Sequence, residues 1–267
     1  AHPARRRRGA PVRLVVPVVP QGFTVVAPYL AAFGVVGIVW GGLVCLVERD
    51  LKRLVAYSSV AHLGFVVLGI ASGTAQGLQG ALFANVAHGL ITGLLFLVAG
   101  GLKDRAGGGS LARIGGALRD RSPRLGGLLA LGCVAGLGLP GLAGFWGELL
   151  AVYGAWQGPP GAGTGDGAPG LAPWRVLAVV AALGTVLAAA YLLRVLRLCW
   201  HGAVEAQPAG PDPTGPDPVG SDASAVEWGV GVPLAVLIVL LGLAPWLLLR
   251  LTEAGVRALL ALSRGAV

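Results

Sequence analysis

The sequence predicts an all-α fold: a polytopic transmembrane helix bundle with about six spanning helices, one of them broken by a proline. Of its 267 residues, 55% are hydrophobic and 12% are charged, whereas an ordinary soluble domain carries about 25% charged residues. The apolar residues fall in blocks of roughly 20, the length that a helix needs to cross a bilayer. The blocks lack the alternation of membrane-barrel strands. Both a soluble fold and a barrel are therefore disfavoured.

The apolar blocks give six spanning segments. In chain order they cover residues 27–47, 54–71, 78–102, 125–153, 174–198 and 228–251. The fourth segment contains Leu139, Pro140 and Gly141, and a proline removes a backbone donor and breaks a helix. We therefore expect this segment to consist of two helices. The stretches 157–173 and 202–225 are rich in Gly and Pro, and they are expected to be irregular loops.

Composition divides the chain into four regions. These are a basic N-terminal tail at 1–11, a membrane domain at 12–201, a flexible loop at 202–226, and a C-terminal transmembrane helix with its tail at 227–267. Residues 12–19 are apolar but too few to span a bilayer alone. The boundaries follow the run of arginines in the tail and the Pro-Asp repeats of the loop.

Loop charge predicts the orientation of the bundle. Lys and Arg gather after the first and third segments, at 49–53 and 103–124, and at the end of the fifth segment, at 194–197. The positive-inside rule puts these places on the cytoplasmic side. The same pattern accounts for the net charge of +8 without a nucleic-acid partner. Four arginines at 5–8 fall on the opposite side, so either this tail is foreign to the fold or the first segments insert differently.

Four ionisable residues in or beside the apolar blocks are candidates for a proton path: Glu148, His88, His62 and Lys52. Such side chains are unfavourable inside a membrane and usually mark an ion or proton pathway. Glu148 is the strongest candidate because it follows the break at Pro140, and broken helices line ion sites in transporters. His88 could instead be a packed histidine bonded to a carbonyl, and Lys52 could be an anchor at the membrane surface.

The third segment has a polar face. Asn85, His88 and Thr92 recur at spacings that place them on one side of a helix. A lipid-facing imidazole would have no partner, so we expect His88 to point into the bundle with Asn85 and Thr92 beside it. The three cysteines are far apart in the sequence and lack the spacing of zinc or iron–sulfur ligands. The sequence therefore predicts no zinc or iron–sulfur site in this chain.

Several short motifs carry a family resemblance. Residues 49–65 read RDLKRLVAYSSVAHLGF, and later matches are QGLQGA at 76–81, AHGL at 87–90, LGLPG at 137–141 and GFWGE at 144–148. In order and spacing they closely resemble a signature of the antiporter-like membrane subunits of respiratory complex I, the NADH:quinone oxidoreductase. The resemblance covers about residues 12–205. The acid at Glu148 favours subunit M (mitochondrial subunit 4), because the similar subunit L usually carries a lysine there.

The resemblance implies a proton-translocating subunit of an enzyme complex, with no redox chemistry in this chain itself. NAD, FMN, iron–sulfur clusters and quinone would be bound by partner subunits. The partners would be other membrane subunits, the lipid bilayer and protons, and the location a bacterial plasma membrane. By the same resemblance, His88 is a central relay, Glu148 the terminal carboxylate, and Lys52 and His62 members of the cytoplasmic approach.

Other interpretations stay open. Subunits of Mrp-type cation/proton antiporters and of membrane-bound hydrogenases share these motifs. The family is built from two inverted repeats, and this chain resembles only the second repeat. Its first ten residues resemble nothing in the family, and it contains no methionine. We therefore expect a truncated or frame-shifted copy, or a fragment, which could also be a non-functional remnant.

Overall fold

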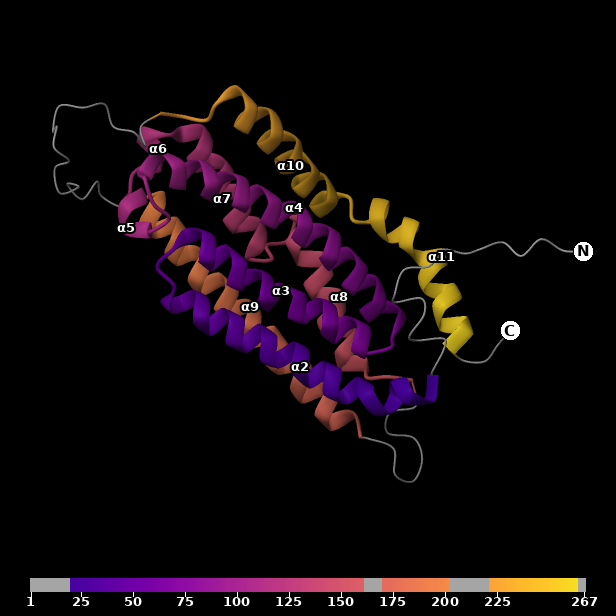
Figure 1. Ribbon diagram of the computed structural model, residues 1–267. Helices are drawn as coiled ribbons and strands as arrows, with labels where there is room; N and C mark the ends of the chain where they lie inside the picture. The colour runs from indigo at the N-terminus through magenta and orange to yellow at the C-terminus, as the bar shows by residue number, and fades with distance from the viewer. Residues whose placement is uncertain (1–19, 161–169, 202–220, 264–267) are drawn as a thin grey trace, which may run out of the picture.

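The computed structural model describes residues 20–160, 170–201 and 221–263, and these form ten α-helices. The helices are α2 (Pro20–Val47), α3 (Leu51–Ala71), α4 (Ala75–Ala106), α5 (Leu111–Ile114), α6 (Leu118–Arg121), α7 (Pro123–Gly136), α8 (Ala143–Gln157), α9 (Leu171–Cys199), α10 (Ala225–Leu243) and α11 (Trp246–Ser263). The long helices lie side by side in a bundle (Figure 1). In these ranges the β pairing is one isolated bridge, between Asp50 and Ser110. The predictions for 1–11, for 12–19 and for most of both loops (161–169 and 202–220) lie outside the described residues.

The predicted membrane helices are present. Each of α2, α3, α4, α9 and α10 contains a stretch that is long and apolar enough to cross a bilayer. The shorter apolar helix α7 is followed directly by α8, and this pair makes the broken segment. Together they confirm the prediction of six apolar segments and of a break in the fourth.

Short polar side chains cap the starts of α3 and α4. Asp50 Oδ1 accepts from the Arg53 N–H at 3.0 Å at the start of α3, and Thr74 Oγ1 accepts from the Gly77 N–H at 3.0 Å at the start of α4. Each bond satisfies an amide that a helix start leaves without an intrahelical partner. Because only short connections separate them, α2, α3 and α4 run as antiparallel neighbours.

The connection between α2 and α3 is hydrogen-bonded to the connection between α4 and α5. The Leu51 N–H donates to the Gly109 carbonyl at 2.8 Å, and the Leu111 N–H donates to the Arg49 carbonyl at 2.8 Å. The last part of α9 reaches the same place, because the Arg194 guanidinium donates to carbonyls at the end of α2. The three basic regions therefore lie together at one end of the bundle, the basic end, as loop charge predicted.

The fourth segment is broken where its proline predicts. α7 stops at Gly136 and α8 starts at Ala143. Between them, Gly138 and Gly141 have φ of +71° and +93°, which glycine adopts without the Cβ clash of other residues. Pro140 lies between the two glycines and has no N–H to continue the helix. The predicted break is confirmed.

Small residues bring α8 close to α4. Gly147 faces Ala84, and Gly154 faces Gly77, so closely that a Cβ on either glycine of α8 would clash with the backbone of α4. Small residues allow such close approach between membrane helices. This contact packs α8 directly against α4, and Glu148 follows Gly147 in the same turn of α8.

The sixth segment differs from the prediction of one helix over residues 228–251. α10 ends at Leu243 and α11 begins at Trp246, with Ala244 and Pro245 between them. Pro245 removes the N–H that would continue the helix, for the same reason as in the fourth segment. The C-terminal region therefore contains two helices where one was expected.

The three cysteines are buried in the bundle and free. Cys45 of α2, Cys133 of α7 and Cys199 of α9 belong to one apolar core. The Cys45 thiol lies 3.4 Å from the Leu54 carbonyl of α3, to which it donates. Among the residues that the structure describes, no group of three or more His, Cys, Asp or Glu side chains could hold a metal ion.

Candidate functional site

Glu148 lies in the second turn of α8, just past the break, and is 7% exposed. Its Oε1 is 2.8 Å from Nδ1 of His62, which belongs to α3. Its Oε2 faces the break, because a Cβ on Gly138 would lie 3.2 Å from this oxygen. The carboxylate is thus enclosed between α3 and the loop that breaks the fourth segment.

His62 joins Glu148 to a tyrosine from a third helix. The Tyr191 hydroxyl of α9 lies 3.3 Å from His62 Nε2, and Tyr191 is fully buried. When the carboxylate is ionised, a neutral His62 donates from Nδ1 to Glu148 and accepts at Nε2 from the tyrosine O–H. All three polar groups then have a partner, which an apolar interior requires.

His88 of α4 lies beside this chain of contacts. Its ring centre is 5.7 Å from that of His62, and its Nδ1 is 3.1 Å from the hydroxyl oxygen of Thr92. A cavity of about 20 Å³ is lined by His62, His88 and Glu148 together with small and apolar residues. That volume suffices for one water molecule. A water there would have three titratable side chains as neighbours.

Two residues singled out from the sequence lie outside this group. Lys52 is the second residue of α3 and is exposed at the basic end. It precedes His62 by ten residues, about 15 Å along a helix. Asn85, expected beside His88, is exposed on α4. Its expected position inside the bundle is wrong, because the helices packed on α4 cover the side that carries His88 and leave Asn85 uncovered.

Tyr191 is the member of the group that sequence reasoning missed. It lies in the fifth apolar segment between Ala190 and Leu192, and no motif marked it. A phenolic hydroxyl in an apolar helix needs a hydrogen-bond partner. This need could have marked Tyr191 as a candidate site residue in the sequence. The partner, His62, comes from another segment 129 residues away in the chain.

The group has the chemistry of a proton relay. An imidazole can take up a proton at one nitrogen and release one from the other. A proton accepted at Nε2 of His62 can therefore leave from Nδ1 to the Glu148 carboxylate, 2.8 Å away. The cavity beside His88 offers room for water to extend this path.

Comparisons with known proteins identify the family of the chain. Residues 12–163 match the family described as NADH:quinone oxidoreductase/Mrp antiporter, TM. The chain is 39% identical over 192 residues to an NAD(P)H-quinone oxidoreductase chain 4 of Synechococcus sp., covering 72% of this chain and 35% of that one. It is 35% identical over 234 residues to NADH-quinone oxidoreductase subunit M of Pseudomonas aeruginosa, covering 88% and 41%. The chain thus spans less than half the length of these relatives.

Solved structures show the same fold. A chain of respiratory complex I from Thermus thermophilus superposes with a TM-score of 0.75 at 30% identity, covering 94% of this chain and 48% of that one. A chain of the Mrp complex from Dietzia sp. superposes with a TM-score of 0.72 at 20% identity, covering 93% and 50%. The latter supports the fold alone. With the family match over more than half of its residues, the chain belongs to the NADH:quinone oxidoreductase/Mrp antiporter transmembrane family.

Proposed function

We propose that this chain carries one half of the proton path of an antiporter-like subunit M in a membrane-bound NADH:quinone oxidoreductase. The observation that carries the proposal is the contact of Glu148 with His62 beside a helix break. A buried carboxylate bonded to an imidazole, with a second imidazole across a water-sized cavity, is suited to passing protons. The names of the Synechococcus and Pseudomonas relatives support the same assignment.

Each residue has a proposed role. Glu148 is the terminal carboxylate, His62 and His88 are the relays, and Tyr191 holds the His62 ring in place. Lys52, exposed at the basic end, belongs to the approach from the cytoplasm. Electron transfer through NAD, FMN, iron–sulfur clusters and quinone is assigned to partner subunits, and other membrane subunits and lipid surround the chain.

The test is proton flux in liposomes that contain a pH-sensitive dye. The chain is co-expressed with the part of the Pseudomonas aeruginosa subunit M that lies outside the matched region, since the match covers 41% of that subunit. Glu148→Gln keeps the shape and loses the titration, so it should abolish the flux. The matched control is Glu253→Gln, because Glu253 is partly exposed on α11. Flux that survives Glu148→Gln would refute the proposal.

A cation/proton antiport activity is the second candidate. The family description names Mrp antiporters beside the oxidoreductase. The same liposomes separate the two. Antiport requires that a sodium or potassium gradient drive proton movement in the opposite direction. Flux that follows the membrane potential and ignores both cation gradients would instead support the proton path.

A further inference from the structure

α10 packs on α4, α7 and α8 through the fully buried Ile238, and polar contacts hold both of its ends. Its buried residues are Gly231, Ile238 and Gly242, and the two glycines let α10 approach Leu128 of α7 and the break of the fourth segment closely. Within a bilayer, burying apolar surface against another helix gains little, because lipid tails are equally apolar. The polar contacts of α10 should therefore decide where it lies.

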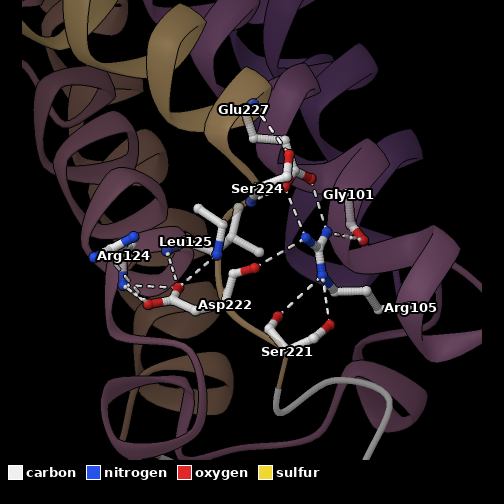
Figure 2. Close-up of polar contacts among 9 residues, drawn as sticks. Gly101, Arg105, Arg124, Leu125, Ser221, Asp222, Ser224 and Glu227 are labelled. Carbon is white, nitrogen blue, oxygen red and sulfur yellow. Dashed lines mark hydrogen bonds and ion pairs between the residues drawn. The ribbon is translucent and has the colours of Figure 1, made fainter.

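The first set of contacts lies at the N-terminal end of α10, as Figure 2 shows. The Arg105 guanidinium, in the last turn of α4, donates to both carboxylate oxygens of Glu227, each at 2.7 Å. It also donates to the carbonyls of Gly101, Ser221 and Asp222. The side chains of Arg105 and Glu227 are each 16% exposed. A forked ion pair with so little access to water is stronger than an exposed pair.

Asp222 ties the same segment to a second helix. Its Oδ1 accepts from the N–H groups of Arg124 at 3.0 Å and Leu125 at 3.2 Å, in the first turn of α7 (Figure 2). A carboxylate is favoured there by the free amides and by the helix dipole. Segment 221–227 is thus fixed to α4 and α7 together, and Glu227 also completes the capping box that starts α10.

The other end of α10 is held by a side chain of α8. The Trp146 indole Nε1–H donates to the Gly242 carbonyl at 2.8 Å. This carbonyl lies where Pro245 interrupts the run of intrahelical bonds. A Cβ on Gly242 would clash with the backbone of Gly141 and Leu142. The end of α10 therefore rests directly on the break of the fourth segment.

We propose that Arg105 and Asp222 hold one end of α10, that Trp146 holds the other end, and that α10 fixed in this way positions Glu148. Trp146 precedes Glu148 by two residues on the same short helix, so its bond to Gly242 fixes the first turns of α8. Arg105 and Trp146 are positioning residues. The functional role of Glu148 rests on the proposed function. The contacts that hold the two ends of α10 are independent of that function.

The experiment uses the full chain in lipid nanodiscs, with its three buried cysteines replaced by alanine. One pair of spin labels, at Val236 and Val186, measures the distance between α10 and α9, and a second pair, at Leu149 and Val60, measures the distance between α8 and α3. All four side chains are exposed. Dipolar spectroscopy should give one narrow distance peak for each pair in the unaltered background.

Arg105→Ala and Trp146→Phe should each cause the loss of the narrow peak for both pairs. Phenylalanine keeps the ring and loses only the N–H donor. Arg105→Lys keeps the positive charge but loses the two parallel N–H donors of the guanidinium. The distance peaks of this variant should be intermediate in width, a result that a misfolded variant would not give. The matched control is Arg257→Ala, because Arg257 pairs with Glu253 on the surface of α11.

Unchanged peaks in Arg105→Ala and Trp146→Phe would overturn the proposal. A broadened α10 peak with an unchanged α8 peak would also overturn it, because α10 would then not position α8. Both readouts are distances, so they remain interpretable if Glu148 proves to carry no protons. A failure of the positioning proposal can therefore be distinguished from a failure of the proposed function.

Discussion

The bundle contains two segments that are broken at a proline. The residues that lie beside the two breaks differ. The break between α7 and α8 contains Gly138 and Gly141 with positive φ and folds over the buried Glu148. The break between α10 and α11 contains Ala244 with an ordinary φ of −124°. Apolar residues follow it until Arg250, which is exposed.

The difference shows that a helix break at a proline does not by itself indicate a functional site. At the first break, the glycines allow the loop to turn back onto the carboxylate. At the second break, a side chain from α8 takes over a carbonyl of the interrupted helix. A buried ionisable group beside the break, within reach of a second such group, is what distinguishes a candidate site from a structural bend.

The largest expected effect comes from removing the partner of the first break's carboxylate. His62→Leu leaves Glu148 buried without its imidazole, which should lower the free energy of unfolding by about 3 kcal/mol and abolish proton flux. Arg250→Leu beside the second break should change stability by less than about 0.5 kcal/mol. Reversible denaturation in mixed micelles measures both. Equal losses would remove the distinction between the breaks.

The next effect concerns how tightly each broken segment is packed. Gly147→Ala places a Cβ against the backbone of Ala84, and such overpacking should cost about 2 kcal/mol. Gly229 of α10 has open space around it, so Gly229→Ala should raise stability by about 0.5 kcal/mol. The same denaturation measurement gives both numbers. A destabilising Gly229→Ala would show that α10 is packed more closely than described.

A smaller effect is expected from the backbone of the first break. Gly141 has a φ of +93°, and an alanine there should be destabilising by about 1.5 kcal/mol. Gly170, at the start of α9, has a φ of −60° and serves as the control, because alanine is unstrained at that angle. If Gly141→Ala were as stable as the parent chain, the positive φ would not be required to shape the break.

The smallest effect is expected at the second break. Pro245→Ala restores an N–H that could bond to the Leu241 carbonyl, but Trp146 still holds Gly242, so stability should change by less than about 0.5 kcal/mol. Spin labels at Leu240 and Leu251, both exposed, report whether α10 and α11 straighten. An unchanged distance is expected. A longer distance would mean that Pro245 alone creates the bend.

Much of the fold followed from the sequence. Block length, charge and Pro140 predicted the segments, the basic end and the first break, because each depends on residues that are adjacent in the chain. Pro245 obeys the same rule as Pro140 but was overlooked, since one proline barely changes the hydropathy of the leucine-rich stretch around it. Segment boundaries from hydropathy are therefore weakest where the breaking residue is isolated.

The site could be predicted only in part. His62 and Glu148 were singled out separately, but their contact joins residues 86 positions apart, and no local pattern contains that information. Helical spacing put Asn85 on the same face as His88, yet spacing does not say which part of a face the neighbouring helices cover. Tyr191 can be recognised as part of the site only from its contact with the His62 imidazole.

The three buried cysteines give the bundle internal reporters of helix separation. Cys45 lies where α2 meets α3, whereas Cys133 and Cys199 lie on α7 and α9. A thiol in such surroundings reacts with a membrane-permeant maleimide only while its helices are apart, so each alkylation rate measures one opening event. The order in which the thiols react, read by mass spectrometry of the digested peptides, would rank the helices by how readily they leave the bundle. No substitution is needed for that measurement.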